Sequence, residues 1–219
     1  MGGWRRLAAV GAFAAAVAAA PAAATEASGP YRLHPAVDVP VTLAALAVAG
    51  IPYELPGLIS PRCPCDRSEV NRLDRFAIGH HDEGAAIASD VTAGLAMLVP
   101  PLADALHLGF GPALRDDVAV FAETLAVNSA LVVIAKYVTQ RPLPITYEGA
   151  PDYVARARGY RSFYSGHTST VAAALAASAW TLRWRDGAGA WPWVVAGVAT
   201  ASVAVERVVE AAKDPARLR

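Results

Sequence analysis

The chain of 219 residues carries 19 Lys and Arg against 19 Asp and Glu, so its formal net charge is zero. This balance argues against a nucleic-acid-binding protein, which normally shows a basic excess or a basic patch, and against a disordered charged chain. Hydrophobic residues make up 55% of the chain, and two cysteines are too few for a disulfide-dense scaffold. Much of the apolar total is alanine, which favours helix, and the mean hydropathy is +0.34. The sequence predicts one all-helical domain, which we expect to be embedded in a membrane.

The N-terminal residues 1–24 have the pattern of an export signal. Arg5 and Arg6 precede an apolar run over 7–20, and small residues at 22–24 offer a cleavage site. An uncleaved signal anchor is the alternative. In either case we expect the chain to be sent to or across the cytoplasmic membrane.

Three further regions follow the signal. Residues 25–84 are a leader and polar loop region that contains a short apolar run, Val39–Ile51, which is too short to span a bilayer comfortably. Residues 85–210 form the helical core, and residues 211–219 are a polar tail. Acidic groups inside the core helices fit a bilayer only if they face the interior of the bundle.

The core pattern predicts four helices separated by one long loop. Apolar runs predict helices over 85–108, 118–135, 166–182 and 188–205, and the prolines 100–101 predict a break in the first of them. The loop over 141–164 is rich in Pro, Gly, Arg and Tyr.

The two cysteines lie in one loop, as Cys63-Pro64-Cys65. Residues so close in sequence make a strained disulfide, and a metal would need more ligands at standard spacing. Two thiols in a loop and an unusual local bridge both remain open.

Two segments carry the chemistry. Lys136 and Arg141 end one helix and supply positive charge and several donors. Ser165, Gly166 and His167 open the next helix, where the backbone amides favour an anion and the His is placed to protonate a leaving oxygen. Each residue alone has an ordinary structural explanation, as a snorkelling Lys, a helix cap or a surface His. Their convergence on one polar loop predicts a phosphate site, without a metal.

These segments resemble the type 2 phosphatidic acid phosphatase (PAP2) and vanadium haloperoxidase superfamily. Its pattern is Lys, six residues and Arg-Pro, then Pro-Ser-Gly-His, then Ser-Arg, five residues, His, three residues and Asp. The second motif stands here as Tyr164-Ser165-Gly166-His167, with Tyr in place of Pro. The resemblance covers residues 85–210 and implies the helical bundle of this superfamily.

The resemblance also implies a reaction and a set of residue roles. It implies a phosphomonoesterase without metal or other cofactor, which forms a phospho-histidine intermediate on a lipid phosphate, an isoprenoid pyrophosphate or another small phosphomonoester. By this resemblance His167 is the general acid. Lys136, Ser165, Gly166 and Arg207 bind the phosphoryl oxygens.

The sequence departs from the superfamily pattern in the first and third motifs. The Arg position of the first motif is held by Leu143, so Arg141 substitutes only if the loop redirects it. In the third motif Lys213 stands at the position of the nucleophilic His, and Arg217 at that of the Asp. A protonated Lys cannot attack phosphorus. The last helix of the superfamily is also missing from the expected fold.

Three explanations compete for the third motif: a truncated or frame-shifted product, a degenerate member that binds phosphate without turnover, or a replacement nucleophile at His80 or His81. The first fits best, because the departure coincides with a sharp change in composition. We therefore expect weak or no turnover. The alternative is a non-catalytic exported or membrane helical protein that binds phosphate-like anions or a partner. We expect the site to face the periplasm from the cytoplasmic membrane, or to lie in the periplasm after signal cleavage.

Overall fold

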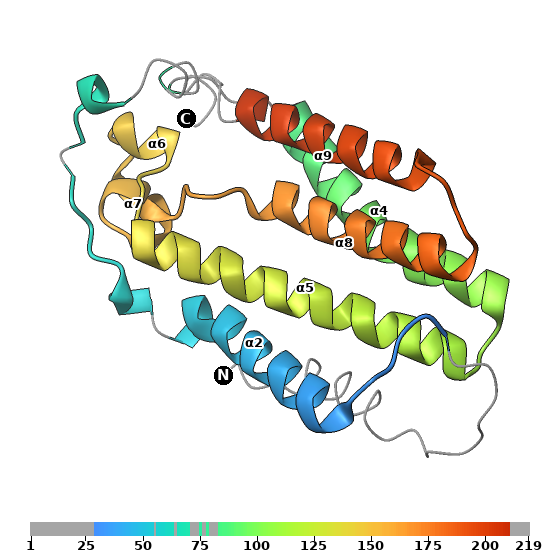
Figure 1. Cartoon of the computed structure of the whole chain (residues 1–219). Helices are drawn as coiled ribbons and strands as arrows, with labels where there is room; N and C mark the ends of the chain where they lie inside the picture. The colour runs from blue at the N-terminus through green and yellow to red at the C-terminus, as the bar shows by residue number, and fades with distance from the viewer. Residues whose placement is uncertain are drawn as a thin grey trace.

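The computed structural model describes residues 29–54, 56–63, 65–70, 75, 78 and 83–210. These residues form helices and turns and contain no strand, which confirms the all-helical prediction. The predicted signal over 1–24 and tail over 211–219 lie outside the described residues, as do His80 and His81. The long helices of the described part are α2 (Pro35–Glu54), α4 (Glu83–Leu108), α5 (Pro112–Thr139), α8 (Gly166–Arg185) and α9 (Trp191–Glu210) (Figure 1).

The helices pack as an up-and-down bundle around α8. This helix contacts α4, α5 and α9, while α2 lies along the outer side of α5. Neighbours that are consecutive in the chain run in opposite directions, so α5, α9 and α2 all end where α4 and α8 begin. That end of the bundle also carries the short helices α6 (Pro144–Tyr147) and α7 (Pro151–Val154).

The helices differ from the sequence prediction in two places. The apolar run Val39–Ile51 belongs to a helix of 20 residues, α2, which packs on α5. The predicted break at 100–101 is wrong, because α4 continues unbroken through Pro100 and Pro101 to Leu108. Proline has a helical φ, but in the interior of a helix it lacks the N–H donor and its ring crowds the carbonyl four residues earlier. The packing of α4 on α8 and α9 therefore outweighs the loss of two hydrogen bonds.

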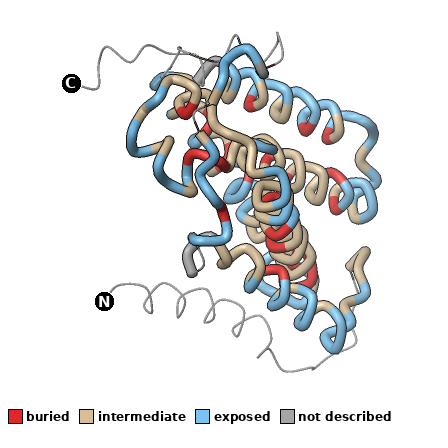
Figure 2. Tube along the Cα trace, turned by 90° about the vertical axis from the view of Figure 1, so that its left-hand side faces the viewer, coloured by how far each residue is buried: buried red, intermediate tan, exposed pale blue. Residues whose placement is uncertain are grey.

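Small side chains fill the space between the helices. The main cluster joins α4, α8 and α9 (buried residues Ala93, Ala96, Val171, Ala174, Val203), and a second one joins α2 to α5 (Ala45, Ala126, Ala130). Figure 2 shows the buried positions turned toward the neighbouring helices, with exposed positions outside. Alanines let the helix backbones approach closely, as in membrane bundles. This close approach brings the ends of α5, α8 and α9 to one place.

The loop between α5 and α8 is held by buried hydrogen bonds. Tyr160 is 0% exposed, and its hydroxyl donates to the carbonyl of Val154 (2.9 Å) and accepts from the N–H of Cys63 (3.1 Å). The carbonyl of Gly159 accepts from the N–H of Leu143 (2.7 Å) and the hydroxyl of Thr146 (2.8 Å). The loop is therefore a fixed platform at the end of the bundle.

A disulfide lies against this platform. Cys63 and Cys65 form a disulfide, with their Cα atoms 4.4 Å apart. Of the two alternatives that the sequence left open, free thiols and a local bridge, the structure has the bridge. The same segment contacts the platform again, because the guanidinium of Arg67 donates to the carbonyl of Tyr147 (3.2 Å).

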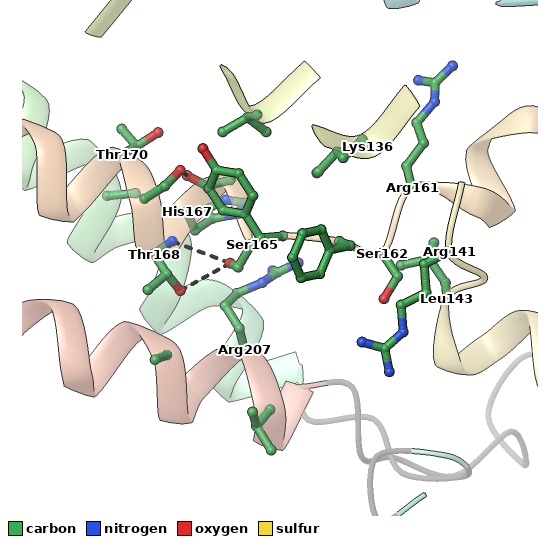
Figure 3. Close-up of a pocket in the computed structure, with 18 of the residues that line it drawn as sticks. Lys136, Arg141, Leu143, Arg161, Ser162, Ser165, His167, Thr168, Thr170 and Arg207 are labelled. Carbon is green, nitrogen blue, oxygen red and sulfur yellow. Dashed lines mark hydrogen bonds between the residues drawn. The ribbon is translucent and has the colours of Figure 1, made fainter. Parts of the chain in front are cut away.

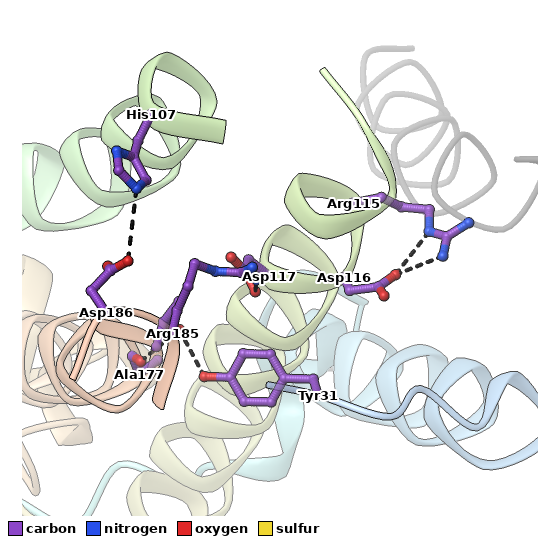
Figure 4. Close-up of polar contacts among 9 residues, drawn as sticks. Tyr31, His107, Arg115, Asp116, Asp117, Ala177, Arg185 and Asp186 are labelled. Atoms are coloured by element: carbon purple, nitrogen blue, oxygen red, sulfur yellow. Dashed lines mark hydrogen bonds and ion pairs between the residues drawn. The ribbon is translucent and has the colours of Figure 1, made fainter. Parts of the chain in front are cut away.

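The opposite end of the bundle is held by a buried ion pair (Figure 4). Arg185 at the end of α8 donates to Asp117 at the start of α5 over 2.6 Å, and their side chains are 14% and 1% exposed. Tyr31 donates to Thr181 (2.7 Å), because the Thr181 hydroxyl donates in turn to the carbonyl of Ala177. Burial raises the pKa of the Tyr31 hydroxyl. These contacts tie the segment before α2 and the start of α5 to α8.

Candidate phosphate-binding site

Lys136 reaches the site from the last turn of α5. The helix ends at Gln140, whose backbone is left-handed with φ 45° and whose N–H donates to the carbonyl of Lys136 over 2.9 Å. This closing turn redirects the chain. Arg141 then lies beside the segment before α8, because the N–H of Ser162 donates to its carbonyl (3.0 Å).

Ser165 is the N-cap of α8, as its position before the helical run predicted. Its hydroxyl oxygen accepts from the N–H of Thr168 (3.3 Å) and from the hydroxyl of Thr168 (3.1 Å). A serine oxygen has two lone pairs and one proton. Because both lone pairs are engaged, the proton of Ser165 is left to donate to a ligand.

Gly166 begins α8 next to Lys136. A Cβ atom at Gly166 would lie 3.9 Å from Nζ of Lys136 and 3.7 Å from a methyl group of Val132. The first N–H groups of a helix have no intrahelical acceptor and lie at its positive end. The ammonium group and the start of α8 are therefore close enough to contact one small anion.

All six residues that the sequence singled out line one cavity of about 1260 Å³. They come from the end of α5 and the loop after it, the start of α8 and the last turns of α9 (Figure 3), and they are Lys136, Arg141, Ser165, Gly166, His167 and Arg207. The structure thus brings the segments together as predicted, while the role of each residue remains a prediction.

Arg141 and Leu143 both line the cavity, so Leu143 does not displace the cation of the first motif from the site. Leu143 is the N-cap of α6 and donates its N–H to Gly159, which fixes its position in the platform. A third arginine of the lining, Arg161, was not singled out as a site residue. It donates to the hydroxyl of Tyr137 (3.3 Å) and lies 5.5 Å from the centre of that ring.

Two residues of α4 reach the site and were missed by the sequence interpretation. Oδ1 of Asp90 lies 2.7 Å from Nε2 of His167. The neighbouring Ser89 is buried, and its hydroxyl oxygen lies 3.5 Å from Nη1 of Arg207. The carboxylate of Asp90 in an apolar helix could have indicated this part of the site, because such groups usually face the interior of a bundle or a cavity.

The cations of the site repel one another. Lys136 is partly buried, and Arg207 and Arg161 are the two cations that act on its ammonium group. Bringing these charges together is unfavourable unless an anion lies between them. Within the described ranges no three His, Cys, Asp or Glu side chains are grouped to hold a metal ion. The arrangement can bind an oxyanion and bring one imidazole to it.

The comparison with protein families agrees with this chemistry. The family model described as the PAP2 superfamily matches residues 117–212, which include the site residues of α5, α8 and α9. This match supports membership of the PAP2 superfamily, a superfamily of phosphatase type. No curated protein and no solved structure matches the chain significantly.

Two helices of the described part are long and apolar enough to cross a membrane. They are Glu83–Leu108, which is α4, and the stretch Pro112–Tyr147, which contains α5. By length and composition these helices are a weak sign of a membrane protein.

Proposed function

We propose that the chain binds the phosphoryl group of a phosphate ester between the end of α5 and the start of α8. The observation that carries this proposal is the position of Lys136 Nζ, 3.9 Å from the Cβ site of Gly166 at the positive end of α8. The Ser165 proton and the N–H groups of Gly166 and His167 would hold the phosphoryl oxygens. The ammonium group would balance their charge.

Phosphoester cleavage in this site would use His167 as the general acid. When the bond between phosphorus and the ester oxygen breaks, the imidazolium gives its proton to the leaving oxygen, so the product leaves as an alcohol. Lys136, Arg141 and Arg207 would stabilise the charge on the equatorial oxygens, which is the main contribution a protein makes to phosphoryl transfer.

Turnover by this chain is proposed to be weak or absent. The phospho-histidine step needs a neutral imidazole as nucleophile, and that position of the third motif is Lys213. Lys213 and Arg217 lie outside the described residues. The sequence at these two positions also favours the second candidate function, a protein that binds phosphate-like anions without cleaving them.

The cavity favours a substrate with an apolar part. Beyond the polar residues its wall is formed by small and apolar residues of five helices, α2, α4, α5, α8 and α9: Ala49, Ala93, Gly94, Met97, Val132, Val133, Ala172 and Ala204. A hydrocarbon chain next to the phosphoryl group would lie against this wall, where apolar contact is favourable. A lipid phosphate or an isoprenoid pyrophosphate is the proposed substrate class.

Embedding in the cytoplasmic membrane is supported by an apolar stripe on α4. Its members recur at helical spacing, are 53% to 81% exposed, and are Ile87, Val91, Leu95, Leu98, Leu102 and Leu106. A continuous apolar surface of this kind is rare on a soluble monomer. The stacked indoles of Trp180 and Trp184 at the other end of the bundle have the character of interfacial aromatic residues.

A site that faces the periplasm is supported by the disulfide. Cys63 and Cys65 lie beside the platform, at the same end of the bundle as the cavity. Disulfides persist in oxidising compartments and are rare in the cytosol. The proposed site therefore faces outward, whether the predicted signal is cleaved or kept.

The test measures binding and cleavage separately on the full chain in detergent. Orthovanadate should bind saturably, and p-nitrophenyl phosphate and a short-chain phosphatidic acid should release at most traces of phosphate. If His167→Ala abolishes readily measured hydrolysis, the chain is a competent phosphatase and the proposal of weak turnover is wrong. If vanadate does not bind, both candidate functions fail.

A further inference from the structure

Among the described residues that line the cavity, one acidic side chain lies with the cations. Asp90 enters from α4, whose residues 83–108 precede the stretch matched by the PAP2 family model. Its carboxylate lines the cavity and lies 2.7 Å from Nε2 of His167. A carboxylate near a phosphoryl group would repel it, so its presence in an anion site calls for a specific reason.

The ion pair contributes little to folding. The side chains of His167 and Asp90 are 36% and 67% exposed, and exposed ion pairs are typically worth less than about 1 kcal/mol. The stability of α4 comes from its packing on α8 and α9. A contribution to folding is therefore a poor explanation of the contact between Asp90 and His167.

The contact does determine the state of the imidazole. An ionised carboxylate only accepts hydrogen bonds, so Nε2 of His167 carries a proton when it contacts Asp90. The acceptor fixes both the ring orientation and the nitrogen that holds the proton. Outer residues that hold a ring in this way act through the ring and need not contact the ligand.

The residue before Asp90 acts on a second group of the site. Ser89 is fully buried, donates its hydroxyl proton to the carbonyl of Ala86 over 2.9 Å, and offers its oxygen to Nη1 of Arg207. Adjacent residues of one helix thus contact His167 and Arg207, two of the predicted site residues. Because α4 packs on both α8 and α9, its position sets the distance between the two groups.

We infer that Asp90 is a positioning residue, which fixes the orientation of the His167 imidazole and keeps a proton on Nε2. This inference rests on the proposed function only for the use of the oriented ring as the general acid. The orientation of the ring is a property of the chain itself and is measurable without substrate.

The test compares Asp90→Ala with Asp152→Ala in the full chain. Asp152 is the matched control, because its side chain is 65% exposed, pairs with Arg156 (3.2 Å) and Arg158 (3.4 Å), and does not line the cavity. Histidine labelled with ¹⁵N reports which ring nitrogens are protonated, and the signals of His167 are assigned from a His167→Gln spectrum. Orthovanadate affinity and the thermal midpoint are measured on the same samples.

The expected result is a loss of the protected Nε2–H signal in Asp90→Ala, which has no acceptor at this position, with wild-type signals in Asp152→Ala and thermal midpoints that agree between the two variants. If Asp90→Ala unfolds, Asp90→Glu replaces it, and the longer side chain should shift the Nε2–H signal. Unchanged His167 signals, or equal changes in the control, would overturn the inference. If wild type binds no vanadate, the proposed function fails, while the spectra still decide the role of Asp90.

Discussion

Replacing Gly166 by Ala separates anion binding from folding. The new Cβ would lie 3.7 Å from Val132 and 3.9 Å from Nζ of Lys136, which are ordinary contacts that need no movement of the neighbours. The methyl group would nevertheless occupy the space between the ammonium group and the start of α8. A phosphoryl oxygen that contacts both groups needs this space.

The two effects have opposite signs. Gly to Ala at a position with helical φ reduces the entropy of the unfolded chain and stabilises by about 0.4–1 kcal/mol. Loss of one hydrogen bond to a charged group costs about 1.5–3 kcal/mol of binding free energy. The dissociation constant for orthovanadate should therefore rise about ten- to hundredfold, while the midpoint of thermal unfolding stays the same or rises.

The assay is vanadate titration by calorimetry, with unfolding followed by circular dichroism in the same detergent. Gly197→Ala in α9 is the matched control, because its Cβ meets no atom within 4 Å and Gly197 does not line the cavity. The control should show the same gain in stability and wild-type affinity. A folded Gly166→Ala protein with wild-type vanadate affinity would refute the assignment of the site to the start of α8.

Three further changes test the scaffold around the site. Asp117→Ala should lower the free energy of unfolding by about 3–5 kcal/mol in chemical denaturation, because it leaves Arg185 buried without its partner. Replacing both residues by apolar ones should recover most of this loss. A loss below about 1 kcal/mol in Asp117→Ala would contradict this prediction. Gly159→Ala should cost about 1–3 kcal/mol and speed proteolysis of the platform, because its Cβ would overlap the carbonyl oxygen of Tyr153; wild-type proteolysis would contradict this. Maleimide should label Cys63 and Cys65 only after reduction, and labelling of the untreated protein would refute the bridge.

The sequence was sufficient for the fold class and for the grouping of the site. Long apolar runs rich in alanine predict helices, and a Lys at the end of one helix with a Ser-Gly-His at the start of the next predicts a shared anion site. Ser165 is the N-cap as its position suggests, because Ser favours that position and its oxygen finds the N–H of Thr168. The helices and the N-cap are local features and were predictable for that reason, whereas the anion site stays a prediction.

The features that the sequence could not supply depend on contacts between distant segments. The distance from Asp90 to His167 depends on the packing of α4 against α8, and no local pattern reports it. The break at the two prolines was wrong for the same reason, since tertiary packing overrides a local preference. The platform that directs Arg141 into the lining rests on Gly159 and Tyr160, whose importance appears only once the loop is folded.

The central claim is that Lys136 and the start of α8 bind one phosphoryl group. The most direct test is the equilibrium binding of inorganic phosphate to the full chain and to Lys136→Ala, with Lys136→Arg as the charge-preserving variant. The account predicts saturable binding by wild type, retained in part by Lys136→Arg and lost in Lys136→Ala while the fold persists. Phosphate binding that is equal in wild type and Lys136→Ala would contradict it.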